Sequence, residues 1–179
     1  MSKKILVLTS SARVRGNSDL LADEFIRGAQ ESGHEVEKIG LSRKNIKGCL
    51  GCNACQRNTG VCVQKDDAIE IIQKMLDADV IVFASPVYYY DVNAQMKLLW
   101  DRTYAQLSTW KNKTVYFITT GAAGDASYFN HIVEGVKLYI GCFENITLGG
   151  YVLGMGTMAK GDVKDTKAMT EAYEMGKGV

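Results

Sequence analysis

The sequence is poor in proline and histidine, and its basic and acidic residues almost balance. Its 179 residues include one proline, two histidines, 21 basic residues and 20 acidic residues. Proteins that bind nucleic acids usually carry a basic excess or stripe, so we expect no nucleic-acid partner. No apolar run approaches the ~18 residues of a membrane span, and none resembles a signal-peptide core. We therefore expect a cytoplasmic protein that does not contact a membrane.

The overall composition is typical of a folded domain. Hydrophobic residues make up 46% of the chain and charged residues 23%. A chain of this length buries about 70% of its unfolded surface, so its core needs no metal or disulfide. No internal repeat and no linker rich in glycine, serine or proline divides the sequence. We therefore expect residues 1–179 to form a single domain.

Short apolar runs alternate with amphipathic segments along the chain. Strands are predicted at 4–9, 35–40, 79–84, 114–119 and 144–153. A segment with helical periodicity follows each strand, although residues 41–65, which lack periodicity, separate the second strand from its helix. Alternation of this kind predicts an α/β fold in three layers (α/β/α), with a parallel sheet between helices.

Three loops that leave the ends of predicted strands are suited to a ligand. The loop at 10–18 leads into a helix N-terminus, where free N–H groups and the helix dipole favour a phosphate. The loop at 85–91 contains three successive tyrosines, whose rings suit a planar heteroaromatic ligand. The glycine-rich loop at 120–125 allows close approach of the backbone. Taken singly, each is also compatible with an ordinary turn or a tyrosine-rich lid or interface.

A fourth segment, residues 154–159, matches the dinucleotide-binding pattern GxGxxG/A in the wrong context. Only 18 residues follow Gly161, which leaves no room for another strand. The acidic residue expected about 20 positions further on is missing for the same reason. We interpret these residues as a flexible loop before the last helix.

Three motifs occur in a characteristic order along the chain. They are Ser-x-Arg-x-x-x-Asn-Ser at 11–18, Ser-Pro-Val-Tyr-Tyr at 85–89 and Ala-Gln-Met-Lys-Leu-Leu-Trp-Asp-Arg at 94–102. Together they resemble the NADPH-dependent FMN reductases of flavodoxin-like fold. The resemblance covers residues from about 4 to 178. It implies a five-stranded parallel sheet in the order 2-1-3-4-5, bound FMN, and a homodimer or homotetramer.

The resemblance also assigns roles to individual residues. The FMN phosphate would be held by Ser11, Arg13, Asn17 and Ser18, the isoalloxazine ring would be lined by Pro86, Val87, Tyr88 and Tyr89, and the loop of Thr120, Gly121 and Gly124 would close the other side. The chain departs from many relatives at residues 10–13 and at Asp91, but no phosphate donor is lost. Because the flavin supplies the redox chemistry, we expect no catalytic side chain. Trp100, Tyr104 and Trp110 are candidate residues of the subunit interface.

The expected function is that of an FMN-dependent oxidoreductase, in which NAD(P)H drives the reduction of a flavin, a quinone or another small acceptor. Two alternatives remain: an iron–sulfur flavoprotein that accepts electrons from a ferredoxin-like donor, and a non-enzymatic electron carrier of the flavodoxin type. A non-catalytic module that senses redox state is a third. Flavodoxin-type carriers are typically strongly acidic, whereas the net charge here is +1.

Four of the five cysteines form a compact pattern, Cys-x2-Cys-x2-Cys-x6-Cys. They are Cys49, Cys52, Cys55 and Cys62, and with Asp66-Asp67 they resemble the iron–sulfur flavoprotein branch of the family. Four cysteines at short spacing are the ligands of a [4Fe–4S] cluster. Zinc is a weaker alternative, because four-cysteine zinc sites usually use two separated pairs. Free thiols or a disulfide are the third. Cys142 is expected to be a small buried hydrophobe.

Overall fold

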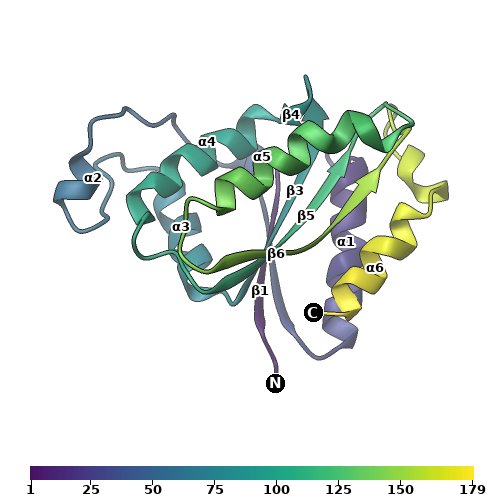
Figure 1. The fold of residues 1–179 in the computed structure, drawn as a ribbon, viewed down its shortest axis with the longest axis horizontal. Helices are drawn as coiled ribbons and strands as arrows, with labels where there is room; N and C mark the ends of the chain where they lie inside the picture. The colour runs from purple at the N-terminus through teal and green to yellow at the C-terminus, as the bar shows by residue number, and fades with distance from the viewer.

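The computed structural model describes residues 1–179 as a parallel sheet between two layers of helices (Figure 1). The main strands are β1 (Lys4–Thr9), β2 (Glu35–Gly40), β3 (Val80–Tyr88), β5 (Lys113–Thr120) and β6 (Ile146–Gly154). They pair in parallel in the order β2-β1-β3-β5-β6. Numbered among themselves, these five strands have the predicted order 2-1-3-4-5, so the predicted fold class is confirmed.

Helices cover both faces of the sheet. One face holds α1 (Asn17–Glu31) and α6 (Ala168–Lys177), and the other holds α3 (Ala68–Asp77), α4 (Ala94–Arg102) and α5 (Asn130–Ile140). The short α2 (Ala54–Arg57) belongs to the cysteine-rich loop, which projects from the body at the left of Figure 1. None of the helices combines the length and the hydropathy needed to cross a bilayer.

The core consists of two apolar layers, one on each face of the sheet. The layer under α3, α4 and α5 contains 26 buried residues, and the layer under α1 and α6 contains 15. Strand β1 contributes to both, because Leu6 and Leu8 face one layer while Ile5 and Val7 face the other. With both faces covered, the ends of the strands are where ligands can reach the sheet.

Strand β3 continues beyond its predicted end and forms a hairpin. The segment predicted as a loop at 85–91 is therefore partly strand, since Pro86 is in register with Thr120 of β5 and Val87 pairs with β4 (Asp91–Val92). Tyr89 and Tyr90 form the turn with φ of 50° and 67°. Two successive residues with positive φ are the geometry of a two-residue hairpin turn.

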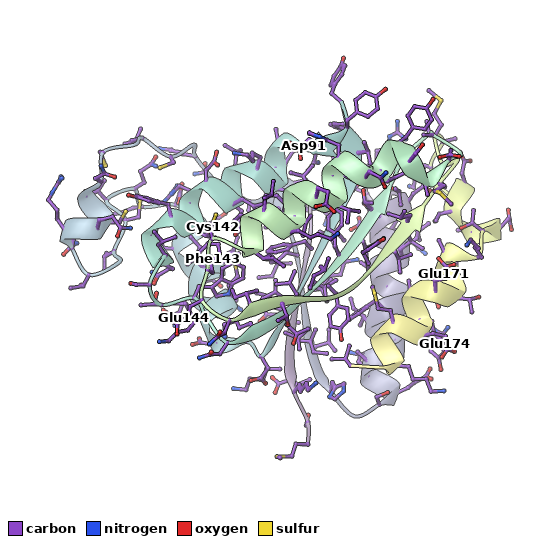
Figure 2. The ribbon with its side chains drawn as sticks, viewed as in Figure 1. Asp91, Cys142, Phe143, Glu144, Glu171 and Glu174 are labelled. Atoms are coloured by element: carbon purple, nitrogen blue, oxygen red, sulfur yellow. The ribbon has the colours of Figure 1, made fainter.

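The predicted surroundings of three residues, Trp100, Trp110 and Cys142, are wrong. Trp100 and Trp110 are not interface residues of the folded chain, because they are only 7% and 1% exposed. Both pack on Tyr139, and the ring of Trp100 stacks on it with a centroid distance of 4.2 Å. Cys142 is exposed rather than buried, in the turn between α5 and β6 (Figure 2). Tyr104, the third predicted interface residue, is 41% exposed.

Candidate functional site

A cavity of about 260 Å³ lies at the C-terminal ends of β1, β3, β5 and β6. It is lined by Ser11, Arg13, Gly16, Asn17, Ser18, Pro86, Val87, Tyr88, Thr120, Gly121, Ala122, Thr157 and Met158. Strand order reverses here, since β1 has β2 on one side and β3 on the other. Of the eleven residues predicted to bind FMN, the structure brings nine to this cavity and leaves out Tyr89 and Gly124.

The loop between β1 and α1 presents backbone donors to this cavity. The Ser11 hydroxyl closes the loop by donating to the Arg13 carbonyl at 3.0 Å and accepting from the Arg13 N–H at 3.2 Å. A Cβ at Gly16 would lie 2.3 Å from Ser11 Oγ, so a larger residue there would displace the Ser11 hydroxyl that closes the loop. Gly16 precedes α1 and supplies no side-chain cap. The N–H groups of the first turn are therefore available to an anion.

Ser18 provides the clearest sign that a polar ligand belongs in the cavity. The residue is 1% exposed, and its hydroxyl oxygen has no hydrogen-bond partner. A buried polar group without a partner costs roughly 1–3 kcal/mol, and this one lines a cavity where a ligand could supply the partner. A phosphate oxygen at the N-terminus of α1 would satisfy this hydroxyl. The residues present thus fit the phosphate of FMN.

The loop after β6 forms one wall of the cavity and is fastened by two predicted phosphate-binding residues. Arg13 Nη1 donates to the Met158 carbonyl at 2.8 Å. The amide of Asn17 donates to the Ala159 carbonyl at 2.8 Å and accepts from the Gly161 N–H at 2.8 Å. Residues 154–159, interpreted from the sequence as a flexible loop before the last helix, are instead a hydrogen-bonded segment in the wall of the cavity.

Two wall residues, Thr157 and Met158, escaped prediction because their position depends on pairing far along the chain. The Thr157 N–H donates to the Gly121 carbonyl at 2.8 Å, which ties the loop after β6 to the loop after β5. This contact follows from the parallel register of β5 and β6, which ends with Thr120 opposite Gly154. No local sequence signal marks such a contact.

Asn93 joins the loops that follow β1 and β3. The residue is fully buried, and its side-chain amide donates to the Ser10 carbonyl at 2.6 Å. Its backbone N–H donates to Ser85 Oγ at 3.1 Å, and its side-chain oxygen accepts from Met96 N–H at the start of α4. An asparagine directly before a helix is a recognisable N-cap, so part of this role could have been found in the sequence.

The four clustered cysteines surround a second, smaller cavity in the loop before α3. Cys49, Cys52, Cys55 and Cys62 all line it, and none of them forms a disulfide. Cys49 Sγ accepts from the Gly51 N–H at 3.4 Å. Nowhere do three or more His, Cys, Asp or Glu side chains come together closely enough to hold a single metal ion. Four thiols around a shared cavity are the donor set of a polynuclear iron–sulfur cluster, so these residues fit such a group.

A buried ion pair closes the base of the cysteine loop. The side chains of Arg102 and Asp66 are 1% and 0% exposed, and their two contacts measure 2.6 Å and 3.0 Å. Arg102 Nη2 also donates to Cys62 Sγ at 3.4 Å. Burial alone would raise the pKa of Asp66, but the hydrogen bonds from Arg102 and from the Lys47 N–H bring the pKa below its usual value. Burial alone would lower the pKa of Arg102, but its interactions with Asp66 and Cys62 outweigh burial and raise the pKa above its usual value.

Helix α4 joins the two candidate sites. Asn93, at its N-terminus, contacts the loops of the larger cavity, and Arg102, its last residue, contacts the cysteine loop. Nine helical residues span about 14 Å. In Figure 1, α4 runs from β4 toward the side from which α2 projects. The two sites are therefore held at a defined separation by one rigid element.

Comparison with known proteins identifies the family and the fold of the chain. The family model described as NADPH-dependent FMN reductase matches residues 3–140. An iron–sulfur flavoprotein of Archaeoglobus fulgidus is 33% identical over 180 residues, which cover 97% of this chain and 77% of the relative. An NAD(P)H:quinone oxidoreductase of Methanothermobacter marburgensis has the same fold, with a TM-score of 0.78, 19% identity and 99% and 97% coverage. An FMN-dependent NADH-azoreductase of Bacillus anthracis, solved with FMN, gives a TM-score of 0.72 at 14% identity and 99% coverage of both chains.

Proposed function

The chain belongs to the NADPH-dependent FMN reductase family and is an FMN-dependent oxidoreductase, and from this premise we propose that FMN binds in the cavity at the ends of β1, β3 and β5. The bound flavin exchanges electrons with NAD(P)H and with a small acceptor. The single observation that carries this placement is the buried, unpartnered hydroxyl of Ser18. It lies where the first turn of α1 offers free N–H groups.

The residues around the cavity divide into phosphate binders and ring binders. The phosphate contacts are Ser11, Arg13, Ser18 and the backbone N–H groups that begin α1. The ring contacts are Pro86, Val87, Tyr88, Thr120 and Gly121, whereas Tyr89 and Gly124 lie outside the cavity lining. Because both polar atoms of the Asn17 side chain bond the loop after β6, we propose that Asn17 offers its backbone N–H instead. Loss of flavin binding in the variants Arg13→Ala and Ser18→Ala, measured by fluorescence quenching of FMN, tests this assignment.

We further propose that Cys49, Cys52, Cys55 and Cys62 hold a [4Fe–4S] cluster that accepts electrons from a ferredoxin-like donor. The name of the Archaeoglobus relative supports the cluster. The charge of the loop supports the donor, because residues 41–65 contain five of the chain's 21 basic residues and none of its 20 acidic ones. The rest of the chain therefore has 16 basic and 20 acidic residues.

The five basic side chains of this loop are available to a partner. They are Arg43, Lys44, Lys47, Arg57 and Lys65, all exposed and none in an ion pair. Small one-electron carriers are typically acidic, and opposite charges steer such partners together at rates that fall with added salt. A basic loop around the cysteines would direct an acidic carrier to the cluster rather than to the flavin.

This electron path can be tested with a matched pair of charge variants. Lys44→Gln/Lys65→Gln removes two charges from the loop, and Lys4→Gln/Lys164→Gln removes two exposed charges elsewhere. With a reduced acidic ferredoxin as donor, we expect the loop variant to react more slowly and with a weaker salt dependence than the control. Equal rates would refute docking at the loop. Absence of iron in anaerobically purified protein would refute the cluster and leave the flavin assignment standing.

A third cavity, larger than the proposed flavin cavity and next to it, favours direct reduction by NAD(P)H as a further electron source. It measures about 660 Å³ and shares Ser11 with the flavin cavity. Arg15 and Arg43 line it and form no ion pair, whereas the three carboxylates of its lining are paired with Lys38 or Lys74. The two unpaired guanidinium groups suit the phosphates at the adenosine end of a dinucleotide. We propose that this end of NAD(P)H binds there. Arg15→Gln/Arg43→Gln should raise the KM for NADPH in steady-state assays with a quinone, whereas an unchanged KM would refute this position.

We propose that residues 1–179 form one FMN-binding domain and that the chain assembles as a homodimer or homotetramer in the cytoplasm. Tyr88, Tyr89 and Tyr90 of the β3–β4 hairpin and Tyr128, which follows β5, are all between 47% and 100% exposed. Exposed aromatic side chains are typical of subunit interfaces. The five free thiols fit a reducing compartment. Light scattering of the FMN-loaded protein, eluted by size exclusion, would test the assembly.

A further inference from the structure

The ion pair between Asp66 and Arg102 holds both ends of the cysteine loop. On the side before Cys49, Arg102 Nη1 donates to the Lys47 carbonyl at 3.0 Å, and Asp66 Oδ2 accepts from the Lys47 N–H at 2.9 Å. On the side after the cysteines, Arg102 Nη2 reaches Cys62 Sγ at 3.4 Å. The four Nη hydrogens of the guanidinium can thus be assigned to the two carboxylate oxygens, one backbone carbonyl and one sulfur.

Stability alone does not account for this pair. Buried ion pairs lose much of their attraction to desolvation, and well-packed apolar residues in their place are often neutral or stabilising. Arg102 also leaves its Nε buried without a partner, which adds to the cost. The arrangement therefore points to a role that apolar side chains would not supply, namely a charged donor beside one particular sulfur.

Cys62 differs from the other three cysteines in its surroundings. It lies seven positions after Cys55 in the sequence and is the one cysteine in contact with a buried charged donor. Cys49 receives a backbone N–H, and Cys55 has only the Gln56 amide at 3.9 Å. A cationic donor at a sulfur favours its thiolate form, and hydrogen bonds to ligand sulfurs tune the potential of a cluster.

We propose that Arg102, held in place by Asp66, is a positioning residue that fixes Cys62 as the fourth ligand of the cluster and raises the cluster's reduction potential. The proposal rests on the [4Fe–4S] assignment made above. It assigns Arg102 no contact with the flavin or the small acceptor. Through α4 and Asn93, the same helix that places this donor also holds the loops of the flavin cavity.

The test uses variants that separate this role from a general structural one. Asp66→Leu/Arg102→Met removes both buried charges together, so no lone charge remains to unfold the chain. Arg102→Lys keeps the positive charge but loses the planar fork that reaches the carboxylate and the sulfur at once. Lys97→Met is the control, because it breaks the exposed pair with Asp101 on the same helix. Each protein is purified without oxygen with FMN bound.

Three measurements decide the outcome: iron and sulfide per chain, the rate of iron release to a chelator, and the cluster potential from an EPR-monitored titration. For Asp66→Leu/Arg102→Met we expect wild-type FMN binding and iron release roughly tenfold faster. We also expect the reduction potential of the cluster to fall by about 59 mV, which corresponds to a tenfold lower affinity for one electron. Arg102→Lys should have an intermediate potential, and Lys97→Met should match the wild type.

Two results would overturn the proposal while the cluster assignment survives. One is wild-type iron retention and potential in the folded double variant. The other is loss of FMN together with iron, which would make the pair a support of the whole domain. A wild-type protein that binds FMN but takes up no iron would overturn the cluster assignment and this inference with it.

Discussion

Replacing Ser18 by alanine should have opposite effects on the stability of the cofactor-free protein and on its affinity for FMN. The Ser18 hydroxyl is buried, faces the cavity side of the first turn of α1 and has no partner. Removing an unsatisfied buried hydroxyl should stabilise the cofactor-free fold by about 1 kcal/mol, the lower part of the cost of leaving such a group unpaired. The same change removes a donor to a charged phosphate.

The expected loss of affinity follows from the strength of a hydrogen bond to a charged group. Such bonds contribute roughly 1.5–3 kcal/mol, so the Kd for FMN should rise roughly 10- to 150-fold. Urea unfolding of the cofactor-free protein gives the first quantity, and quenching of FMN fluorescence gives the second. Ser32→Ala is the control, because its exposed hydroxyl bonds the Lys177 carbonyl at the far end of α1. A Ser18→Ala protein that is destabilised, or that binds FMN as tightly as the wild type, would refute the reasoning.

Three further predictions address the loop wall, the helix packing and a buried phenol. Asn17→Ala should weaken FMN binding and lower the stability by about 1–3 kcal/mol, since it frees loop 159–161; unchanged FMN quenching would contradict this. Gly176→Ala should destabilise the protein to urea by about 1–3 kcal/mol, because its Cβ would lie 2.0 Å from the Phe25 carbonyl oxygen, and iron content should not change. Burial raises the pKa of Tyr139 above its ordinary value of 10.0, so the folded state loses stability as the pH rises above about 10, when the unfolded chain ionises. Tyr139→Phe should show a shallower loss between pH 9 and 11 in urea unfolding, and equal slopes would refute this.

Several features were predictable because their signals are local. The strands predicted at 4–9 and 79–84 are apolar at every position from 5 to 8 and from 80 to 84, which is what a strand covered on both faces requires. Loops that follow such strands meet at one edge of a parallel sheet, so the residues at 11–18, 86–88 and 120–121 could be expected to lie together. The cysteine spacing likewise predicts that four thiols share one small cavity, since fourteen residues of chain keep them close.

The wrong or missing predictions concern segments whose local sequence is compatible with more than one structure. Trp100 could equally have faced a partner subunit, and its burial depends on Tyr139 arriving from α5. The strand at Val80 could have ended before Pro86, but pairing with β5 and the turn at Tyr89 extend it to Tyr88. In each case the deciding contact comes from another element of the fold.

The sequence by itself determined the order of elements, the edge of the sheet where the cavity of the proposed flavin site lies, and the cluster of thiols, because periodicity and spacing act within a few residues. Only the tertiary structure decided that Arg102 contacts Cys62, which is 40 residues away in the sequence. The same holds for Met158, which lines the cavity together with Arg13, 145 residues away, and accepts a hydrogen bond from it. Such contacts depend on strand register and on the position of α4 over the sheet. Both are set by the packing of the whole core rather than by the residues that meet.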